Sequence, residues 1–190
     1  MPKPPIRIVE QRTVFDGYYP LQKIRYAQRR ADGRVQEQTR EVYGSDSGVT
    51  ALLYDRTRRT LLFTRQFRIG AHLAGHDGFL IETAAGVLEG ADPLERIRAE
   101  IREELGYTVD DLRHVMTLFA SPGTLTEQVH YFVGEYRLDD RCSAGGGKEA
   151  KARTSRCANS AATRPWTSWL VARSWTSRLS YCCNTCSCTS

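Results

Sequence analysis

The segment from Gly86 to Tyr107, GVLEGADPLERIRAEIREELGY, constrains the fold more than any other part of the chain. Asp92 before Pro93 is a strong helix start, because aspartate caps free N–H groups and proline loses no hydrogen bond at the first helical position. Gly106 is a typical helix end. The apolar residues between them, at helical spacing, are Leu94, Ile97, Ile101 and Leu105. The segment therefore predicts one helix with a narrow apolar stripe facing a core.

Three glutamates lie on the same predicted helix. Glu100, Glu103 and Glu104 fall on an arc of about 100° beside the apolar stripe. Carboxylates this close repel one another, and their hard oxygens favour Mg²⁺ bound jointly with substrate phosphates. The alternative is a solvated acidic face, which is the usual meaning of glutamate clusters on helices. The three glutamates alone favour that alternative. The choice between a metal site and a solvated face therefore depends on the sequence around them.

Strand patterns surround the helix, and with 190 residues and 41% hydrophobic content the chain is long enough for one compact domain. The predicted strands are residues 7–15, 20–27, 35–43, 49–54, 60–67, 79–82, 114–120 and 127–137. Asp-Gly turn signals separate the first three strands and predict a small N-terminal sheet. The other strands, interrupted by one long helix, indicate an α/β sandwich.

The charge of the chain is unevenly distributed. The formal net charge is +5, but residues 148–190 hold seven Lys or Arg against one acid, which leaves 20 basic and 21 acidic groups in residues 1–147. A basic chain of this kind would suggest a nucleic-acid or membrane partner only if the charge were spread. We expect neither partner. The sequence has no apolar run of membrane-spanning length and no secretory signal pattern, which favours a cytoplasmic location.

The segment 86–107 resembles the Nudix box, in which a glycine loop and an acidic residue precede a helix ending in Glu-apolar-x-Glu-Glu-x-Gly. The match departs from the usual pattern at three points: Asp92 stands where Glu is common, the spacer before Glu100 is one residue short, and Ala99 replaces the usual Arg. That Arg normally steadies the glutamates. Arg98 and Arg102 are the candidates to replace it.

The resemblance continues through QTREVYGSDSGVTALLYD, LLFTRQFRIG, LIETAAG, SPGTLTE and AGGG, so that roughly residues 6–147 are similar to the GDP-mannose pyrophosphatase branch of the Nudix hydrolases. It implies the Nudix fold, an α-β-α sandwich with a mixed sheet in residues 46–147. It also implies a small antiparallel sheet in residues 1–45 that is used in dimerisation. The implied reaction is Mg²⁺-dependent cleavage of a nucleotide sugar, with Mn²⁺ as a substitute, to a nucleoside monophosphate and a sugar 1-phosphate.

Carried over by position, the resemblance implies that the metal is held by the backbone carbonyl of Ala85 and by Glu100 and Glu104. Glu103 stands beside them as a further metal-binding and catalytic candidate. Glu127 is the candidate general base, because it ends a flexible-looking loop, 121–126, that could bring a carboxylate to the attacking water. Its alternative interpretation is an ordinary glutamate at a strand end.

Substrate-binding candidates fall into two groups. Arg65 and Arg68 are suited to bidentate contact with diphosphate oxygens, although both could be exposed arginines that pair with surface acids. The other matched positions are Ala85, Gly86 and Val87 at the glycine loop, and Tyr18, Thr39, Arg40 and Glu41 near the N-terminus. The N-terminal group is often offered across a dimer in this family, so the resemblance implies a homodimer.

The box does not choose a substrate. GDP-mannose is the first expectation and ADP-ribose the second, since no sequence pattern here identifies the side chains that select the base. The rival class is a non-catalytic nucleotide-binding protein that keeps the fold, motivated by Ala99 and by the tail described below. Mg²⁺-dependent turnover discriminates the two classes.

The end of the chain has a different chemistry from the rest. Residues 148–190 contain all three Trp and five of the six Cys, in repeats that follow neither helical nor strand periodicity. The terminal cysteines at C-x-x-C and C-x-C spacing suggest a soft-metal or redox site, but no second cysteine pair accompanies them.

The genetic code explains this tail better. When the third base of each codon is read with the first two bases of the next, both Trp-Thr pairs must give Asp, and Tyr181-Cys182 must give Leu. One decoding from about Glu149 reads GEGEDIEV, which resembles the acidic strand that follows AGGG in this family and supplies another metal-binding Glu. We therefore hypothesise that a frame change near Lys148 makes residues 148–190 an out-of-frame, poorly ordered tail.

Overall fold

The computed structural model describes residues 6–146 and 156–160. Within them the chain divides into two compact units, one of residues 6–47 and 119–128 and the other of residues 48–118, 129–146 and 156–160. No helix in these described ranges is long and apolar enough to span a membrane. Most of the predicted tail, residues 148–155 and 161–190, lies outside the described residues, and so does the acidic strand expected there.

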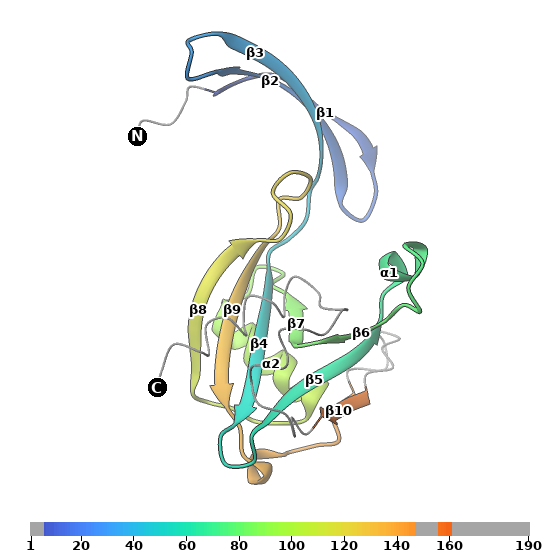
Figure 1. Ribbon diagram of the computed structural model, residues 1–190, viewed down its shortest axis with the longest axis vertical. Helices are drawn as coiled ribbons and strands as arrows, with labels where there is room; N and C mark the ends of the chain where they lie inside the picture. Colours follow the sequence, from blue (N-terminus) through green and yellow to red (C-terminus); the bar gives the residue numbers. More distant parts are fainter. Residues whose placement is uncertain (1–5, 147–155, 161–190) are drawn as a thin grey trace. The chain divides into compact units, whose positions relative to one another are not determined.

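The first unit is built on a three-stranded antiparallel sheet (Figure 1). Its strands are β1 (Ile6–Asp16), β2 (Pro20–Arg29) and β3 (Val35–Tyr43), with β2 in the middle. The loop 121–126 belongs to this unit, because Tyr43 N donates to Thr124 O at 2.8 Å and Ser45 N donates to Thr126 Oγ1 at 2.9 Å. The loop that looked flexible is therefore hydrogen-bonded to the chain that leaves β3.

The second unit holds a mixed seven-stranded sheet (Figure 1). Its strands are β4 (Gly48–Asp55), β5 (Thr60–Phe67), β6 (Phe79–Glu82), β7 (Ala84–Val87), β8 (Leu112–Phe119), β9 (Gln128–Glu135) and β10 (Arg156–Ser160). The main order is β10-β5-β4-β9-β8, with β6 beside β5 and β7 beside β4. β4 runs parallel to β9 and antiparallel to β5 and β7. Seven of its eight residues are buried, as its apolar sequence requires of a central strand.

The helix of the second unit begins where the sequence predicts. Asp92 Oδ1 accepts hydrogen bonds from Leu94 N at 2.9 Å and Glu95 N at 3.1 Å, and α2 (Pro93–Glu100) follows. The last turn, η1 (Ile101–Leu105), is π-helical, with Gly106 N donating to Ile101 O five residues back at 3.1 Å. Gly106 ends it at φ 76°, a left-handed conformation that favours glycine.

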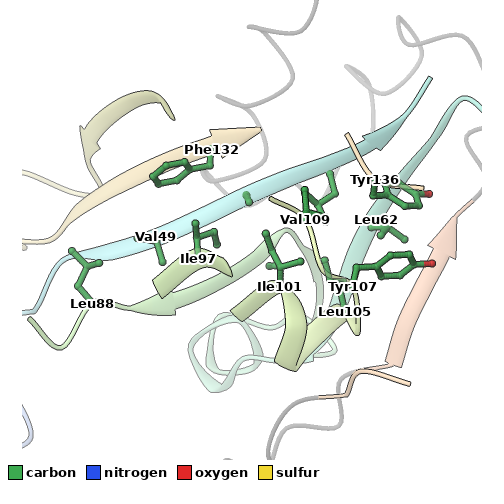
Figure 2. Close-up of a cluster of buried hydrophobic side chains, with 13 residues drawn as sticks. Val49, Leu62, Leu88, Ile97, Ile101, Leu105, Tyr107, Val109, Phe132 and Tyr136 are labelled. Carbon is green, nitrogen blue, oxygen red and sulfur yellow. The ribbon is translucent and has the colours of Figure 1, made fainter. Parts of the chain in front are cut away.

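The apolar stripe packs as predicted. Ile97, Ile101 and Leu105 are at most 1% exposed and lie against buried residues of the sheet (Figure 2). The partly buried Leu94 packs against this cluster. α2 contacts both β4 and β7, and η1 contacts β5 and β7. The main hydrophobic core of the second unit therefore lies between this helix and the sheet, and it fixes which helix edge turns toward β7.

Four elements of the fold differ from the sequence expectation. The glycine loop at Gly86 is a strand, β7, whose Gly86 pairs with Val49. A five-residue helix, α1 (Ile69–Leu73), and a short 3₁₀ turn, η2 (Leu138–Asp140), were not predicted. β10 pairs with β5 inside the segment expected to be poorly ordered. Of the expected α-β-α layers, the described residues provide the mixed sheet and the helical layer formed by α2 and η1, since α1 buries no residue.

Removing the cap of α2 is expected to destabilise the fold. Asp92→Ala leaves the Leu94 and Glu95 N–H groups without their side-chain acceptor, which should lower the free energy of unfolding by about 0.5–2 kcal/mol. Asp92→Asn is the matched control. Asparagine caps about equally well, so this variant should change the free energy of unfolding by only about a few tenths of a kcal/mol. Urea denaturation of the three proteins measures the difference, and equal losses in both variants would contradict the capping role.

A histidine on β9, His130, should make stability depend on pH. His114 and His130 each contact the Thr117 hydroxyl at 3.0 Å. Burial, and secondarily the nearby His114, lower the pKa of His130 below its ordinary value. Its protonation therefore favours the unfolded chain, so its contribution is fully present above about pH 6.5 and is lost as pH falls toward the lowered folded pKa.

His130→Gln is expected to reduce the loss of stability between neutral pH and about pH 5. The measurement is the urea midpoint at several pH values for the parent and the variant. His72→Gln is the control, since His72 is exposed on α1. A pH slope unchanged by His130→Gln, or reduced equally by the control, would contradict the assignment.

Candidate active site

Two of the three helix glutamates are buried on one edge of the helix. Glu100 and Glu104 are each 1% exposed, although carboxylates are almost never fully buried without compensating partners. Both face β7, the strand that the sequence presented as a glycine loop. A Cβ placed on Gly86 would overlap the carboxyl group of Glu100. Glycine is required at this position because the Glu100 side chain fills the space over the backbone.

Neutral donors hold Glu104. Its Oε1 accepts a hydrogen bond from Gln66 Nε2 at 3.0 Å, and its Oε2 accepts one from Ala85 N at 3.2 Å. Gln66 lies on β5 and is 4% exposed, and Ala85 lies on β7. The carboxylate of Glu104 is therefore fixed between two strands of the sheet without an arginine among these donors.

An arginine holds Glu100. Arg96 Nη2 lies 2.5 Å from Glu100 Oε1, and Arg96 Nε donates to the Val87 carbonyl at 2.8 Å. Arg98, one of the two candidates to replace the box arginine, contacts Glu95 and the Asp110 carbonyl, and Arg102, the other candidate, is exposed. Arg96 reaches Glu100 because position 96 lies one turn before it on the same side of the helix.

Glu103 differs from its two neighbours. It lies in the π-helical turn and is only partly buried. In the part of the chain that the structure describes, no three His, Cys, Asp or Glu side chains gather closely enough to hold a metal ion. The metal-binding and catalytic roles of Glu103 therefore stay predictions.

The remaining groups fit a divalent cation. Glu100 and Glu104 offer hard oxygen donors on a buried edge of the helix, and the backbone of β7 lies beside them at Ala85 and Gly86. Mg²⁺ is commonly held by one or two carboxylates and completes its coordination with water and substrate phosphates. A binding set of two carboxylates and one backbone oxygen therefore suits the chemistry that the sequence implied.

The two arginines at the end of β5 are both engaged. Arg68 contacts Glu82 Oε2 through Nε at 2.9 Å and Nη2 at 2.5 Å, and the Glu82 side chain is 8% exposed. The Arg65 guanidinium lies over the Phe79 ring, 4.2 Å from its centre. Arg68 is thus fixed by a buried acid on β6 that sequence reasoning did not identify.

The other predicted residues belong to the first unit. The side chain of Tyr18 is 86% exposed, and its ring packs edge-on against that of Tyr19. On β3, Arg40 donates to the Gln38 side chain at 2.7 Å. Glu127 is partly buried, and its backbone carbonyl accepts from Ala120 N at 3.0 Å. Also exposed on β3 are Thr39 and Glu41.

A charged hollow lies on the N-terminal sheet. It is lined by Glu10, Arg12, Lys23, Arg25 and Thr39. Three of these five side chains are cationic, and Arg12 and Arg25 lie 3.6 and 3.5 Å from Glu10. Thr39 is the one member that sequence reasoning selected. The other four residues could have been found from the charges that alternate along neighbouring strands. Lys23 and Arg25, for example, are two residues apart on β2 and therefore point to the same face of the sheet.

Comparisons with known proteins show which family this chain is similar to. Residues 5–43 match the family described as GDP-mannose pyrophosphatase NudK N-terminal domain. The chain is 42% identical over 145 residues to a GDP-mannose pyrophosphatase of Salmonella arizonae, covering 76% of each chain. It is 41% identical over 148 residues to that of Klebsiella pneumoniae, covering 77% of this chain and 75% of the relative.

Solved structures give the same fold. The crystal structure of an ADP compounds hydrolase matches with a TM-score of 0.54 at 15% identity, covering 75% of this chain and 72% of the other. The mixed sheet and the additional three-stranded sheet confirm the fold expected from the sequence. At the identity found with the Salmonella and Klebsiella enzymes, and over more than two thirds of their length, the chain belongs to the GDP-mannose pyrophosphatase family of Nudix hydrolases.

Proposed function

We propose that the chain hydrolyses the diphosphate bond of a nucleotide sugar, with GDP-mannose as the first substrate and GMP and mannose 1-phosphate as the products. The observation that carries the proposal is the burial of Glu100 and Glu104 on the helix edge that faces β7. The names of the Salmonella and Klebsiella relatives support the choice of substrate.

In this proposal Glu100, Glu104 and the Ala85 carbonyl hold Mg²⁺, or Mn²⁺ in its place, with Glu103 beside them. The metal, when bound, neutralises the diphosphate oxygens and makes a bound water more acidic. Gln66 and Ala85 N keep the Glu104 carboxylate at the strand, at 3.0 and 3.2 Å, so it needs little rearrangement on binding. Burial excludes competing water from these two carboxylates.

Water attacks one phosphorus of the diphosphate, and the bond from that phosphorus to the bridging oxygen breaks. Glu127 accepts the proton of the attacking water, with Glu103 as the second candidate for this role. Arg65 and Arg68 bind the diphosphate oxygens beside the backbone of Gly86 and Val87. The ion pair of Arg68 with Glu82 supports this role, because it fixes the guanidinium while leaving 37% of the side chain exposed.

Nucleotide contacts are assigned to the first unit. Tyr18, Thr39, Arg40 and Glu41 would meet the nucleotide across a homodimer formed through the three-stranded sheet. The charged hollow that includes Thr39 has three cationic side chains among its five residues, which supports binding of an anionic ligand on this sheet. We propose a cytoplasmic enzyme with neither nucleic acid nor membrane as a partner.

A parallel kinetic assay tests the proposal. The chain is incubated with GDP-mannose and with ADP-ribose in Mg²⁺, and again after chelation with EDTA, and the products are separated by chromatography. The expected result is Mg²⁺-dependent turnover with a higher kcat/KM for GDP-mannose. A higher kcat/KM for ADP-ribose would overturn the substrate choice, and binding of both nucleotides without turnover would support the non-catalytic alternative.

A further inference from the structure

The contacts of Arg96 extend in two directions from one guanidinium group. Nη2 lies 2.5 Å from the buried Oε1 of Glu100, and Nε donates to the Val87 carbonyl at 2.8 Å. The Arg96 side chain is itself only 17% exposed. The contact with Val87 is a hydrogen bond and the contact with Glu100 is an ion pair, so a guanidinium anchored at the strand holds its charge beside the carboxylate. Arg96 therefore ties Glu100 of α2 to the backbone of β7.

The residues at positions 86, 98 and 99 bear on this link. Gly86 leaves room for the Glu100 carboxyl group directly over the strand, because glycine has no Cβ to occupy that space. A charge that is 1% exposed needs a nearby counter-charge to remain buried. Position 99, which carries arginine in the Nudix pattern, is alanine here, and Arg98 is engaged with Glu95 and the Asp110 carbonyl.

We propose that Arg96 is a positioning residue that holds Glu100 against the β7 backbone and so preforms the metal-binding carboxylate of the site. This inference rests on the proposed function for its consequence in catalysis. Its structural part concerns the position of Glu100 in the protein alone. Removing a residue that orients a metal ligand typically weakens metal binding by roughly 10- to 100-fold.

The test uses Arg96→Met and Arg96→Lys, with Mn²⁺ as the probe. Methionine keeps much of the side-chain volume without the charge, and lysine keeps the charge but not the second contact with Val87. Titration followed by the electron paramagnetic resonance signal of free Mn²⁺ should show binding weakened by roughly 10- to 100-fold in Arg96→Met and less in Arg96→Lys. Arg98→Met is the matched control from the same helix and should bind Mn²⁺ as the parent does.

A second measurement, urea unfolding, shows whether Arg96→Met also loses stability. Removal of Arg96 leaves a buried carboxylate without its guanidinium, so Arg96→Met should unfold at lower urea, and the double variant Arg96→Met/Glu100→Gln should regain most of the loss. A crystal structure of Arg96→Lys should retain Glu100 over Gly86. Unchanged or tighter Mn²⁺ binding in Arg96→Met, or no recovery in the double variant, would overturn the inference.

Failure of the proposed function gives a different pattern. A parent that binds Mn²⁺ and loses this binding in Arg96→Met, yet turns over no nucleotide sugar, would leave the positioning role standing and remove the proposed reaction. Equal turnover of GDP-mannose by the parent and by Arg96→Met would remove the positioning role and leave the reaction standing.

Discussion

Glu104→Gln is expected to lower kcat for GDP-mannose by about 100- to 1,000-fold, the loss typical of removing one electrostatic group from an active site. Glutamine has nearly the same shape, but its amide carries no charge for a cation. One end of the amide is also a donor, which would face either Gln66 Nε2 or Ala85 N. Steady-state kinetics at saturating Mg²⁺ measures the effect on turnover.

The control for Glu104→Gln is Glu95→Gln. Glu95 lies on the same helix but is exposed, and it pairs with Arg98 at 2.8 Å. Its replacement should change turnover little and the free energy of unfolding by no more than about 0.5 kcal/mol. Glu104→Gln should remain folded, with a stability loss of about 1–3 kcal/mol from the mismatched donors. Retention of near-parental turnover by folded Glu104→Gln would remove this carboxylate from the site.

Gly86→Ala is expected to have the second largest effect. The new Cβ would occupy the space of the Glu100 carboxyl group, so the carboxylate has to leave its position over β7 and its contact with Arg96. Overpacking of this kind costs about 1–3 kcal/mol of stability. We expect kcat to fall by roughly 10- to 100-fold, as when a metal ligand loses its orientation.

Gly70→Ala provides the comparison for Gly86→Ala. Gly70 lies in α1, and an added Cβ there would meet no atom within 4 Å. This variant should keep the parental kcat, since the methyl group displaces nothing. Thermal unfolding and kinetics on both variants separate a loss of fold from a loss of site geometry. Equal kcat in the two variants would show that Glu100 does not need its place over Gly86.

The sequence predicted the elements in which local signals agree with tertiary packing. The strands 35–43, 60–67 and 79–82 have the predicted bounds, and the helix begins at the Asp92 cap. The apolar stripe identified the buried face, because an amphipathic helix has only one face to pack on a core. Burial of that stripe also places Glu100 and Glu104 on an edge that turns toward β7.

The rest depended on contacts that no spacing encodes. The strand β7 has only four residues, with Gly86 among them, and it forms because it pairs with β4. The π-helical turn changes the angle per residue after Glu100, so a projection at constant 100° did not separate partly buried Glu103 from fully buried Glu104. Gln66 and Arg96 reach the glutamates from outside the acidic cluster, where no motif marks them.

The frame change near Lys148 stays a hypothesis. The match to the Salmonella relative covers 145 residues and 76% of both chains, so about a quarter of each chain lies outside it. Resequencing the coding DNA is the test. A repeatedly confirmed, uninterrupted frame would exclude a sequencing error, and comparison with a frame-restored version would then show whether turnover depends on the replaced segment.

The most direct test of the central claim is a ³¹P NMR time course of GDP-mannose with the purified protein, recorded with Mg²⁺ and again with EDTA. We expect the two diphosphate signals to give way to the monoester signals of GMP and mannose 1-phosphate only when Mg²⁺ is present, and we expect Glu104→Gln to suppress this change. Diphosphate signals that persist with Mg²⁺, or that decay equally with EDTA, would contradict a hydrolytic metal site at Glu100 and Glu104.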